Sequence, residues 1–464
     1  MKVVIIGGGP CALGAAWRLA EMGHDDWVIC EKEDYWGGLS ASFQDDDGFW
    51  WDLGGHVLFS HYGYYDNVMD TLLGKQDGWV FHERESWVWM QDRFIPYPMQ
   101  NNIHHLPREC FWECLEGIVD IGINNGKARP RNFGEWIDST FGTGLGKWFL
   151  RPYNYKVWAY PVEEMDWSWV GERVAPVDLK RILNNSVFEK DDISWGPNAR
   201  FRFPLEGGTG AIWRSLAKSL PEEKAYSGRG MSGISVSERK VSFTDGTAEE
   251  YDVLLSSIPV TTLLHYLKSD LSCGSVPPLK HSATHVVGLA LNGTTPDRLA
   301  TKCWIYFPED DCPFYRGTVF SNYSPNNVPD IKRQWSLMLE VSESPAKKVD
   351  RETVVEDVIE GAIKTRLLSS RDEIDHTWYR YIEKGYPTPS LGRNSHLFPL
   401  LIELEEAGIF SRGRFGAWRY EVGNMDHSFM QGVEFVNRLL HQGEELTLWY
   451  PDIVNSVHPS GKRR

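Results

Sequence analysis

Near its start the chain runs Val3-Val4-Ile5-Ile6-Gly7-Gly8-Gly9-Pro10-Cys11-Ala12. The apolar residues predict a buried strand, and the apolar spacing that follows predicts a helix up to Glu21. Gly7, Gly9 and Ala12 fit the pattern GxGxxG/A, in which the first glycine makes a tight turn and the second lets the backbone approach a pyrophosphate. A second apolar strand, Trp27–Cys30, ends at Glu31, where such units place the carboxylate that binds a ribose hydroxyl. The sequence therefore predicts a β-α-β unit that binds a dinucleotide.

The composition is that of a folded protein that is not embedded in a membrane. Of 464 residues, 42% are hydrophobic and 24% are charged, which excludes a disordered chain. The formal net charge of −16 argues against nucleic acid or an anionic membrane surface as a partner, and no apolar run is long enough for a membrane span. The seven cysteines form no CxxC pair and show no zinc-ligand spacing, so we expect a reducing, cytoplasmic location and no metal site.

A second glycine turn, Gly37-Gly38-Leu39-Ser40, follows the acidic residue. Its resemblance to flavoproteins favours FAD over NAD as the bound cofactor. Two later segments resemble other places where such flavoproteins surround FAD, namely Glu206-Gly207-Gly208-Thr209-Gly210 and Ser256-Ser257-Ile258-Pro259. No second GxGxxG is followed by a strand and an acidic residue, so we expect no separate, permanent NAD domain.

Six further segments resemble UDP-galactopyranose mutases of the eukaryotic type, in a consistent order along nearly the whole chain. They are Asp52-Leu53-Gly54-Gly55-His56-Val57-Leu58-Phe59-Ser60-His61, Arg151-Pro152-Tyr153-Asn154-Tyr155-Lys156-Val157-Trp158, Gly171-Glu172-Arg173-Val174-Ala175, Cys303-Trp304-Ile305-Tyr306-Phe307-Pro308, Cys312-Pro313-Phe314-Tyr315-Arg316 and Gly413-Arg414-Phe415-Gly416-Ala417-Trp418-Arg419-Tyr420-Glu421-Val422-Gly423-Asn424.

The resemblance and the strand and helix patterns together imply an α/β fold. We expect a Rossmann-like FAD-binding domain, an inserted helical lobe and a mainly antiparallel β-sheet domain that holds the substrate. The expected bounds are 1–90, 205–265 and 395–464 for the FAD-binding domain, 106–192 for the helical lobe, and 91–105, 193–204 and 266–394 for the β-sheet domain.

The resemblance implies an isomerase that interconverts UDP-galactopyranose and UDP-galactofuranose without net redox change. In that family N5 of reduced FAD attacks the anomeric carbon of the sugar, UDP leaves, and UDP returns after the sugar ring has opened and reclosed. It also implies NADPH or NADH as the reductant of the flavin, and a monomer or homo-oligomer as the assembly.

The resemblance also implies the site residues. Arg173 and Arg316 would hold the diphosphate, because a guanidinium stays charged and donates two parallel hydrogen bonds to phosphate oxygens. His56 would lie beside the reactive edge of the flavin. The substrate would further contact Tyr97, Gln100, Phe149, Tyr153, Asn154, Trp158, Asn198, Tyr306, Tyr323, Tyr386 and Tyr420. The cofactor would contact Gly7, Gly9, Ala12, Glu31, Gly38, Leu39, Ser40, Gly55, His56, Arg414, Gly423, Asn424, Met425 and Ser428.

Two positions differ from the pattern, since Met99 stands where an aromatic residue is common and Met425 replaces a frequent glutamine. Three alternatives stay open at the level of sequence. The first is a pyranose-furanose mutase for another nucleotide sugar, the second an amine-oxidase-like flavin oxidase or desaturase, and the third a flavin- or nucleotide-binding sensor without turnover.

Overall fold

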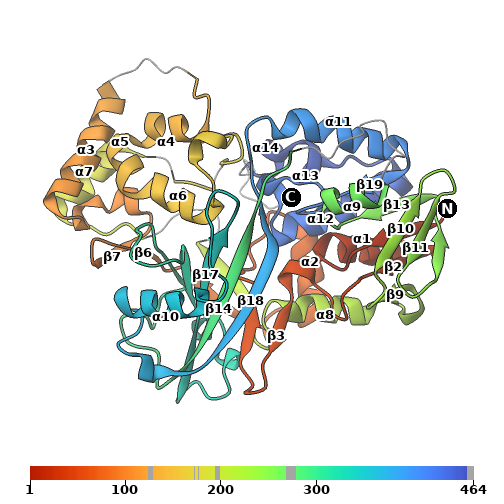
Figure 1. Cartoon of the computed structure of the whole chain (residues 1–464), viewed down its shortest axis with the longest axis horizontal. Helices are drawn as coiled ribbons and strands as arrows, with labels where there is room; N and C mark the ends of the chain where they lie inside the picture. The colour runs from red at the N-terminus through yellow and green to blue at the C-terminus, as the bar shows by residue number, and fades with distance from the viewer. Residues whose placement is uncertain (124–128, 172, 176, 194–198, 268–277, 457–464) are drawn as a thin grey trace.

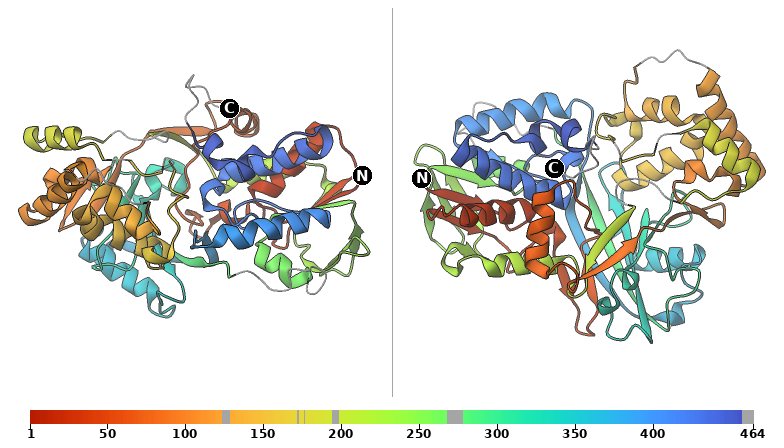
Figure 2. Two further views of the ribbon diagram at one scale, coloured as in Figure 1. Left: turned by 90° about the horizontal axis from the view of Figure 1, so that it is seen from above. Right: turned by 180° about the vertical axis from the view of Figure 1, so that it is seen from behind.

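The computed structural model describes residues 1–123, 129–171, 173–175, 177–193, 199–267 and 278–456. Figures 1 and 2 show a nucleotide-binding unit that contains the N-terminus, a large antiparallel sheet, and a helical lobe at the far side of that sheet. This arrangement confirms the predicted combination of a Rossmann-like unit, a helical lobe and a mainly antiparallel sheet.

The nucleotide-binding unit is built on a five-stranded sheet in the order β19-β13-β1-β2-β9, and every pairing in it is parallel. All four residues of β1 are buried, because helices cover both faces of the sheet. The strands are β1 (Val3–Ile6), β2 (Trp27–Cys30), β9 (Ala225–Tyr226), β13 (Val253–Ser256) and β19 (Ile409–Ser411). The helices packed with this unit are α1 (Pro10–Glu21), α2 (Gly63–Leu73), α8 (Gly210–Ser219), α9 (Val260–Leu267), α11 (Arg393–Glu406), α12 (Met425–His441), α13 (Leu446–Trp449) and α14 (Pro451–Val454).

Helices α1 and α12 pack closely on one face of this sheet (Figure 1). A Cβ on Gly432 would lie 2.0 Å from the carbonyl oxygen of Cys11, and one on Gly14 would lie 2.5 Å from that of Phe429. Only glycine permits this approach, so the two positions fix how α12 lies on the first β-α-β unit.

The second sheet has seven strands in the order β18-β14-β17-β16-β15-β6-β7 and is antiparallel except where β15 pairs with β6. Its strands are β6 (Ser86–Met90), β7 (Arg93–Pro96), β14 (His281–Asn292), β15 (Trp304–Tyr306), β16 (Arg316–Val319), β17 (Gln334–Glu343) and β18 (Ile374–Pro387), with α10 (Val354–Lys364) on one face. Strand β6 lies inside the expected bounds of the FAD-binding domain, but its pairing with β15 places it in this sheet. Strand β16 stops at Val319, because the chain enters a 3₁₀ turn over Phe320–Asn322.

The helical lobe packs on β6 and β7 through one apolar cluster. It contains α3 (Arg108–Ile123), α4 (Phe133–Phe141), α5 (Thr143–Leu145), α6 (Arg151–Trp158) and α7 (Leu179–Phe188). The side chains of Asn132 and Asp178 cap the starts of α4 and α7, each by accepting a hydrogen bond from a backbone N–H three residues later.

Smaller pieces complete the chain. The short strands are β3 (Ser42–Gln44), β4 (Trp50–Asp52), β5 (Trp79–Glu83), β8 (Arg200–Pro204), β10 (Met231–Ser235), β11 (Lys240–Phe243) and β12 (Ala248–Glu250). Among the helices in the described ranges, none is long and apolar enough to cross a bilayer.

Candidate active site

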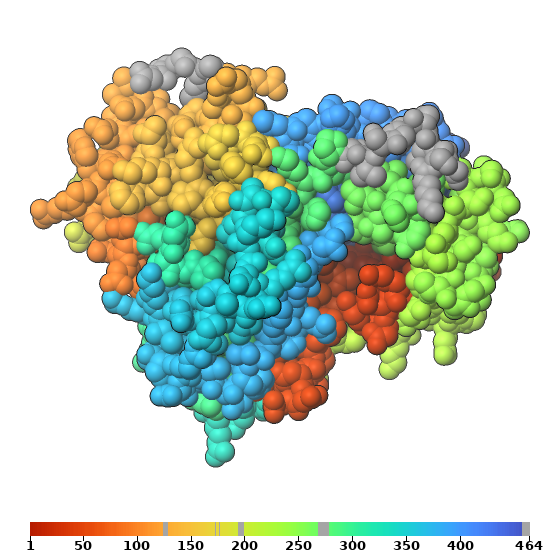
Figure 3. Space-filling view, in the orientation of Figure 1, coloured from red at the N-terminus to blue at the C-terminus, as the bar shows by residue number. Residues whose placement is uncertain are grey.

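A cavity of about 1040 Å³ lies where the two sheets and the helical lobe meet. Its walls come from the glycine turn after β1, from α6, from β15 to β18 and from the start of α12. Figure 3 shows one face of the molecule, hollowed beside the red N-terminal segment. The cavity brings together residues that are far apart in the sequence.

The glycine turn after β1 forms one end of this cavity. A Cβ on Gly9 would meet no atom within 4 Å, so the space above it is open, whereas Gly7 has a φ of +105° and a Cβ there would lie 2.3 Å from Ser257 Oγ. Glu31 is buried, accepts a hydrogen bond of 2.8 Å from the backbone N–H of Glu33, and has its pKa raised by that burial. Gly38, Leu39 and Ser40 also line this end. Ala12 does not line the cavity, because it packs in the core between α1 and the sheet.

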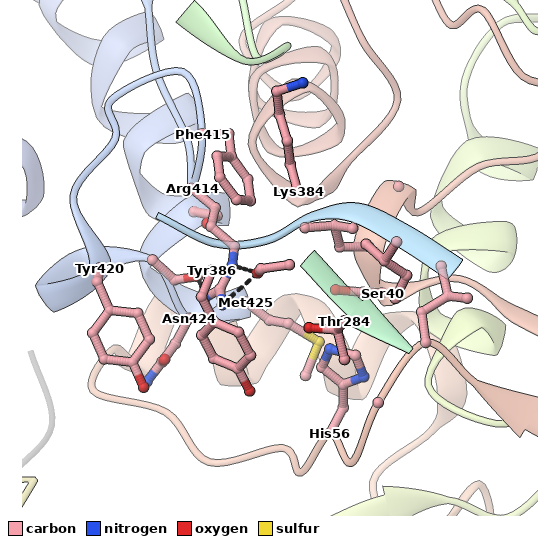
Figure 4. Close-up of a pocket in the computed structure, with 18 of the residues that line it drawn as sticks. Ser40, His56, Thr284, Lys384, Tyr386, Arg414, Phe415, Tyr420, Asn424 and Met425 are labelled. Carbon is pink, nitrogen blue, oxygen red and sulfur yellow. Dashed lines mark hydrogen bonds between the residues drawn. The ribbon is translucent and has the colours of Figure 1, made fainter. Parts of the chain in front are cut away.

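The start of α12 and the residues before it form the neighbouring wall (Figure 4). Arg414 donates to the carbonyl oxygens of Gly423, at 3.0 Å, and Gly385, at 3.1 Å, and so joins this wall to β18. Asn424, Met425 and Ser428 all line the cavity. The N–H of Ser428 donates to the Asn424 carbonyl, so the helical N–H groups that α12 leaves for a ligand precede Ser428.

The loop Gly54-Gly55-His56 lies against β16 and β17. The N–H of Gly55 donates to Glu340 Oε1 at 3.0 Å, and a Cβ on Gly55 would lie 2.6 Å from Thr318 Oγ1. Burial lowers the pKa of His56 to about 4, so its imidazole is neutral near pH 7. Among the described residues, His56 Nδ1 has no hydrogen-bond partner. The loop therefore presents an uncharged ring to the cavity, and Figure 4 shows this ring near Thr284 and Met425.

Arg316 is held by a buried carboxylate that the sequence analysis does not single out. Glu340 is 2% exposed and accepts from Arg316 Nε at 2.7 Å and from Nη2 at 2.8 Å. It also accepts from the Tyr315 hydroxyl at 2.7 Å. A signal for this residue is present in β17, where Leu337-Met338-Leu339-Glu340-Val341 places one acidic residue in an apolar strand.

Arg173 lines the same cavity and has a different environment. Its Nη2 donates to the Glu421 carbonyl at 2.6 Å, and its guanidinium lies 5.7 Å from the centre of the Tyr420 ring. Within the described part of the chain it forms no ion pair, so its charge is not neutralised by a carboxylate. Arg84, which the sequence analysis omits, also lines the cavity and lies over the rings of Tyr97 and Trp304. Several cationic groups thus converge in a strongly acidic protein, which suits an anionic ligand.

Aromatic side chains from three elements line the end of the cavity next to the helical lobe. The rings of Phe149 and Tyr153 stack with centres 5.6 Å apart, and Tyr306 meets the edge of Tyr153. Gln100 donates from Nε2 to the Ala175 carbonyl at 2.8 Å, while its buried Oε1 has no partner among the described residues. Tyr97, Asn154, Trp158, Tyr386 and Tyr420 line this cavity as well.

Two predicted substrate residues do not join this group. Tyr323 is fully buried and packs against Phe201 and Phe203 instead of lining the cavity, because the turn that follows β16 directs it into a separate aromatic cluster. Asn198 lies outside the described residues.

The comparisons with known proteins agree with this architecture. Residues 5–73 match the family of NAD(P)-binding Rossmann-like domains. Among curated proteins, the 15-cis-phytoene desaturase of Synechococcus elongatus is 27% identical over 238 residues, which are 48% of this chain and 42% of that protein. The corresponding desaturase of Capsicum annuum is 36% identical over 129 residues, 27% of this chain and 20% of that protein. The chain thus spans less than half the length of these curated relatives.

Several solved structures match along almost the entire chain. A putative protoporphyrinogen oxidase from Exiguobacterium sp. 255-15 has a TM-score of 0.72 and 16% identity, covering 94% of this chain and 98% of that chain, and shares the fold. The crystal structure of a reduced UDP-galactopyranose mutase has a TM-score of 0.93 and 48% identity, covering 98% of this chain and 99% of that chain. At that identity over nearly the full length of both proteins, this chain belongs to the UDP-galactopyranose mutase family.

Proposed function

We propose that the chain interconverts UDP-galactopyranose and UDP-galactofuranose, with reduced FAD as its cofactor and with no net redox change. The observation that carries this proposal is that Arg173 and Arg316 line one cavity together with the glycine turn Gly7–Gly9 and the tyrosines. An anionic diphosphate and a dinucleotide cofactor can therefore meet in one cavity. Family membership supports the same reaction.

The residues at the glycine turn fit FAD. The open space over Gly9 admits a pyrophosphate close to the backbone, and Glu31 lies where a ribose hydroxyl would follow. Gly38, Leu39 and Ser40 would enclose the nucleotide, while Gly55, Arg414, Gly423 and the start of α12 would hold the flavin half. When bound and reduced, FAD would supply the nucleophile for attack at the anomeric carbon of the sugar, and the residues named above would hold it in place.

The chain's own residues would bind the substrate and orient it. Arg173 and Arg316 would stabilise the negative charge that develops on the departing diphosphate. Glu340 fixes the guanidinium of Arg316 in advance, so little reorganisation is needed when UDP leaves. Uracil would stack on Tyr153 and contact Phe149, and Gln100 Oε1, which has no partner among the described residues, would accept a hydrogen bond from the edge of the base.

The reductant, location and assembly belong to the same proposal. NADPH or NADH would reduce the flavin, and it would do so without a separate protein domain to bind it. The enzyme would be located in the cytoplasm and would act as a monomer or homo-oligomer.

The test is anaerobic conversion of UDP-galactofuranose by the purified flavin-loaded protein, followed by chromatography. One sample contains oxidised flavin and the other flavin reduced with dithionite. We expect conversion only in the reduced sample, and an Arg316→Lys variant should lose most turnover because lysine keeps the charge but lacks the bidentate geometry. Equal conversion with oxidised flavin would contradict the mechanism.

A second nucleotide sugar is the main competing substrate. It is favoured if the reduced protein binds UDP but leaves UDP-galactofuranose unchanged. An apolar polyene, as the desaturase relatives would suggest, is disfavoured because Arg84, Arg173 and Arg316 line the cavity.

A further inference from the structure

A group of two histidines and one aspartate lies outside the cavity, on the helical lobe. The ring nitrogens of His104 and His105 and a carboxylate oxygen of Asp191 lie within 4.8 Å of one another. His104 and His105 belong to the 3₁₀ turn Ile103–His105, whereas Asp191 follows α7. The group therefore joins two segments that are far apart in the sequence.

His104 is the unusual member of this group. Its side chain is only 8% exposed, and among the described residues neither ring nitrogen has a hydrogen-bond partner. Two buried ring nitrogens without hydrogen bonds are costly, and such a position requires an explanation. The polar atom opposite it is Asp191 Oδ1, which lies 3.5 Å from His104 Nε2.

The three donors suit a transition-metal ion. Nitrogen and oxygen donors bind zinc at about 2.0–2.2 Å, so two donors of a tetrahedral site lie roughly 3.4 Å apart. The separation between His104 Nε2 and Asp191 Oδ1, 3.5 Å, is close to this value. His105 Nε2 is 2.6 Å from the same oxygen, as in a direct hydrogen bond, and would turn slightly away to share the ion.

The surroundings hold the ligands in place. The side chain of Asn102 accepts from the N–H of Asp192 and donates to its carbonyl, both at 2.8 Å. Arg181 also pairs with the Asp192 carboxylate. These contacts fix the backbone next to Asp191 opposite the two histidines, as an outer shell does around a metal site.

We propose that His104, His105 and Asp191 bind one divalent transition-metal ion, preferentially zinc, which fastens the Ile103–His105 turn to the segment after α7. A water molecule would complete a tetrahedral site. The ion would have a structural role, since none of the three residues lines the cavity. The proposal does not depend on the reaction assigned above.

The test uses the tag-free, flavin-loaded full chain, freed of metal with EDTA and dialysed. Zinc is then titrated in competition with a chromogenic chelator, and Tm is measured with and without zinc. The variants are Asp191→Asn and His105→Asn, both at accessible side chains that can change without exposing a core. The matched controls are Asp25→Asn and His265→Asn, which are exposed and remote from the group.

We expect the wild type and both controls to bind one equivalent of zinc and to gain Tm on zinc addition. Asp191→Asn and His105→Asn should each bind about tenfold more weakly or worse and lose the gain in Tm. Failure of the wild type to bind one equivalent, or unchanged binding by both variants, would overturn the proposal.

Discussion

At the scale of single residues, Glu340 connects three parts of the site. Its carboxylate pairs with Arg316, accepts from Tyr315 and accepts from the N–H of Gly55 in the His56 loop. Burial is the largest single influence on the pKa of Glu340 and would raise it, but the Arg316 charge and the hydrogen bonds from Arg316, Tyr315 and Gly55 together hold that pKa below its usual value. A charged residue in the middle of an apolar strand is therefore explained by the cation that it orients.

Replacing Glu340 by Gln should separate the effect of the carboxylate charge from the effect of side-chain size. The amide keeps the size of the side chain but leaves the Arg316 charge without its buried partner, which costs up to about 3–5 kcal/mol. We expect a lower Tm and a loss of about 10-fold or more in kcat/KM, measured with reduced flavin. Glu352→Gln, at an exposed position, is the control. Wild-type Tm together with wild-type kcat/KM would show that the pair is dispensable.

Gly9 provides a second test at this scale. The Cβ of an alanine at position 9 would meet no atom within 4 Å, and the φ of −80° suits any residue. Gly9→Ala should therefore fold, and the Tm of its apoprotein should be nearly unchanged. The added methyl group projects into the space proposed for the pyrophosphate, so the flavin content of the purified protein should fall. Gly233→Ala, which also meets nothing, should keep its flavin. A fully flavin-loaded Gly9→Ala protein would argue against this placement of the cofactor.

At the scale of elements, α12 serves the core and the site together. Its first turn lines the cavity, Gly432 permits close packing on α1, and Glu434 contacts the start of α13. Glu434 accepts from the N–H and the hydroxyl of Thr447, both at 2.8 Å. Despite these bonds, burial raises the pKa of Glu434 to about 7. The helix therefore carries a carboxyl group that is unfavourable when ionised.

The pH dependence of stability follows from this pKa. Between the unfolded pKa near 4.5 and about 7 the folded protein holds a proton that the unfolded chain has lost, so the contribution of Glu434 falls as pH rises through this range. Glu434→Gln removes this penalty and should raise stability by up to about 3 kcal/mol at pH 8 and by little at pH 5. Thermal unfolding at pH 5 and pH 8 measures this change in stability, with Glu406→Gln, at an exposed position, as the control. An equal change in Tm at the two pH values would refute the assignment.

The elements also show how far sequence can predict this molecule. The unit β1-α1-β2 is predictable because its apolar spacing and glycine turn are local features. The pairing of β6 with β15 is not, because a strand carries no local mark of a partner more than 200 positions away. Tyr323 lies outside the lining of the cavity for a related reason, since a short turn after β16 directs its ring into another cluster. That Arg173 and Arg316 line one cavity could be expected from the family resemblance. Glu340 could be recognised from the sequence as an acidic residue in an apolar strand.

At the scale of the whole molecule, the cavity lies at the junction of all three units. Gly9 belongs to the nucleotide-binding unit, Tyr153 and Arg173 to the helical lobe region, and Arg316 to the seven-stranded sheet. A ligand that spans this space contacts every unit and binds only when they are assembled. Ligand binding should therefore stabilise the chain against global unfolding.

The final prediction uses UDP, which tests the substrate end without any chemistry. At a UDP concentration of 100 times its Kd, the flavin-loaded protein should gain about 2.7 kcal/mol and a corresponding rise in Tm. Arg173→Ala and Arg316→Ala should lose most of this rise at the same UDP concentration, because each removes a cation from the proposed diphosphate site. Arg131→Ala, at an exposed position on the helical lobe, should respond like the wild type. Both cavity variants should still gain Tm when FAD is added to their apoproteins, since the glycine turn is intact. If the cavity variants responded to UDP as the wild type does, the diphosphate would have to bind elsewhere. A retained response to FAD would still support the assignment of the flavin end of the cavity.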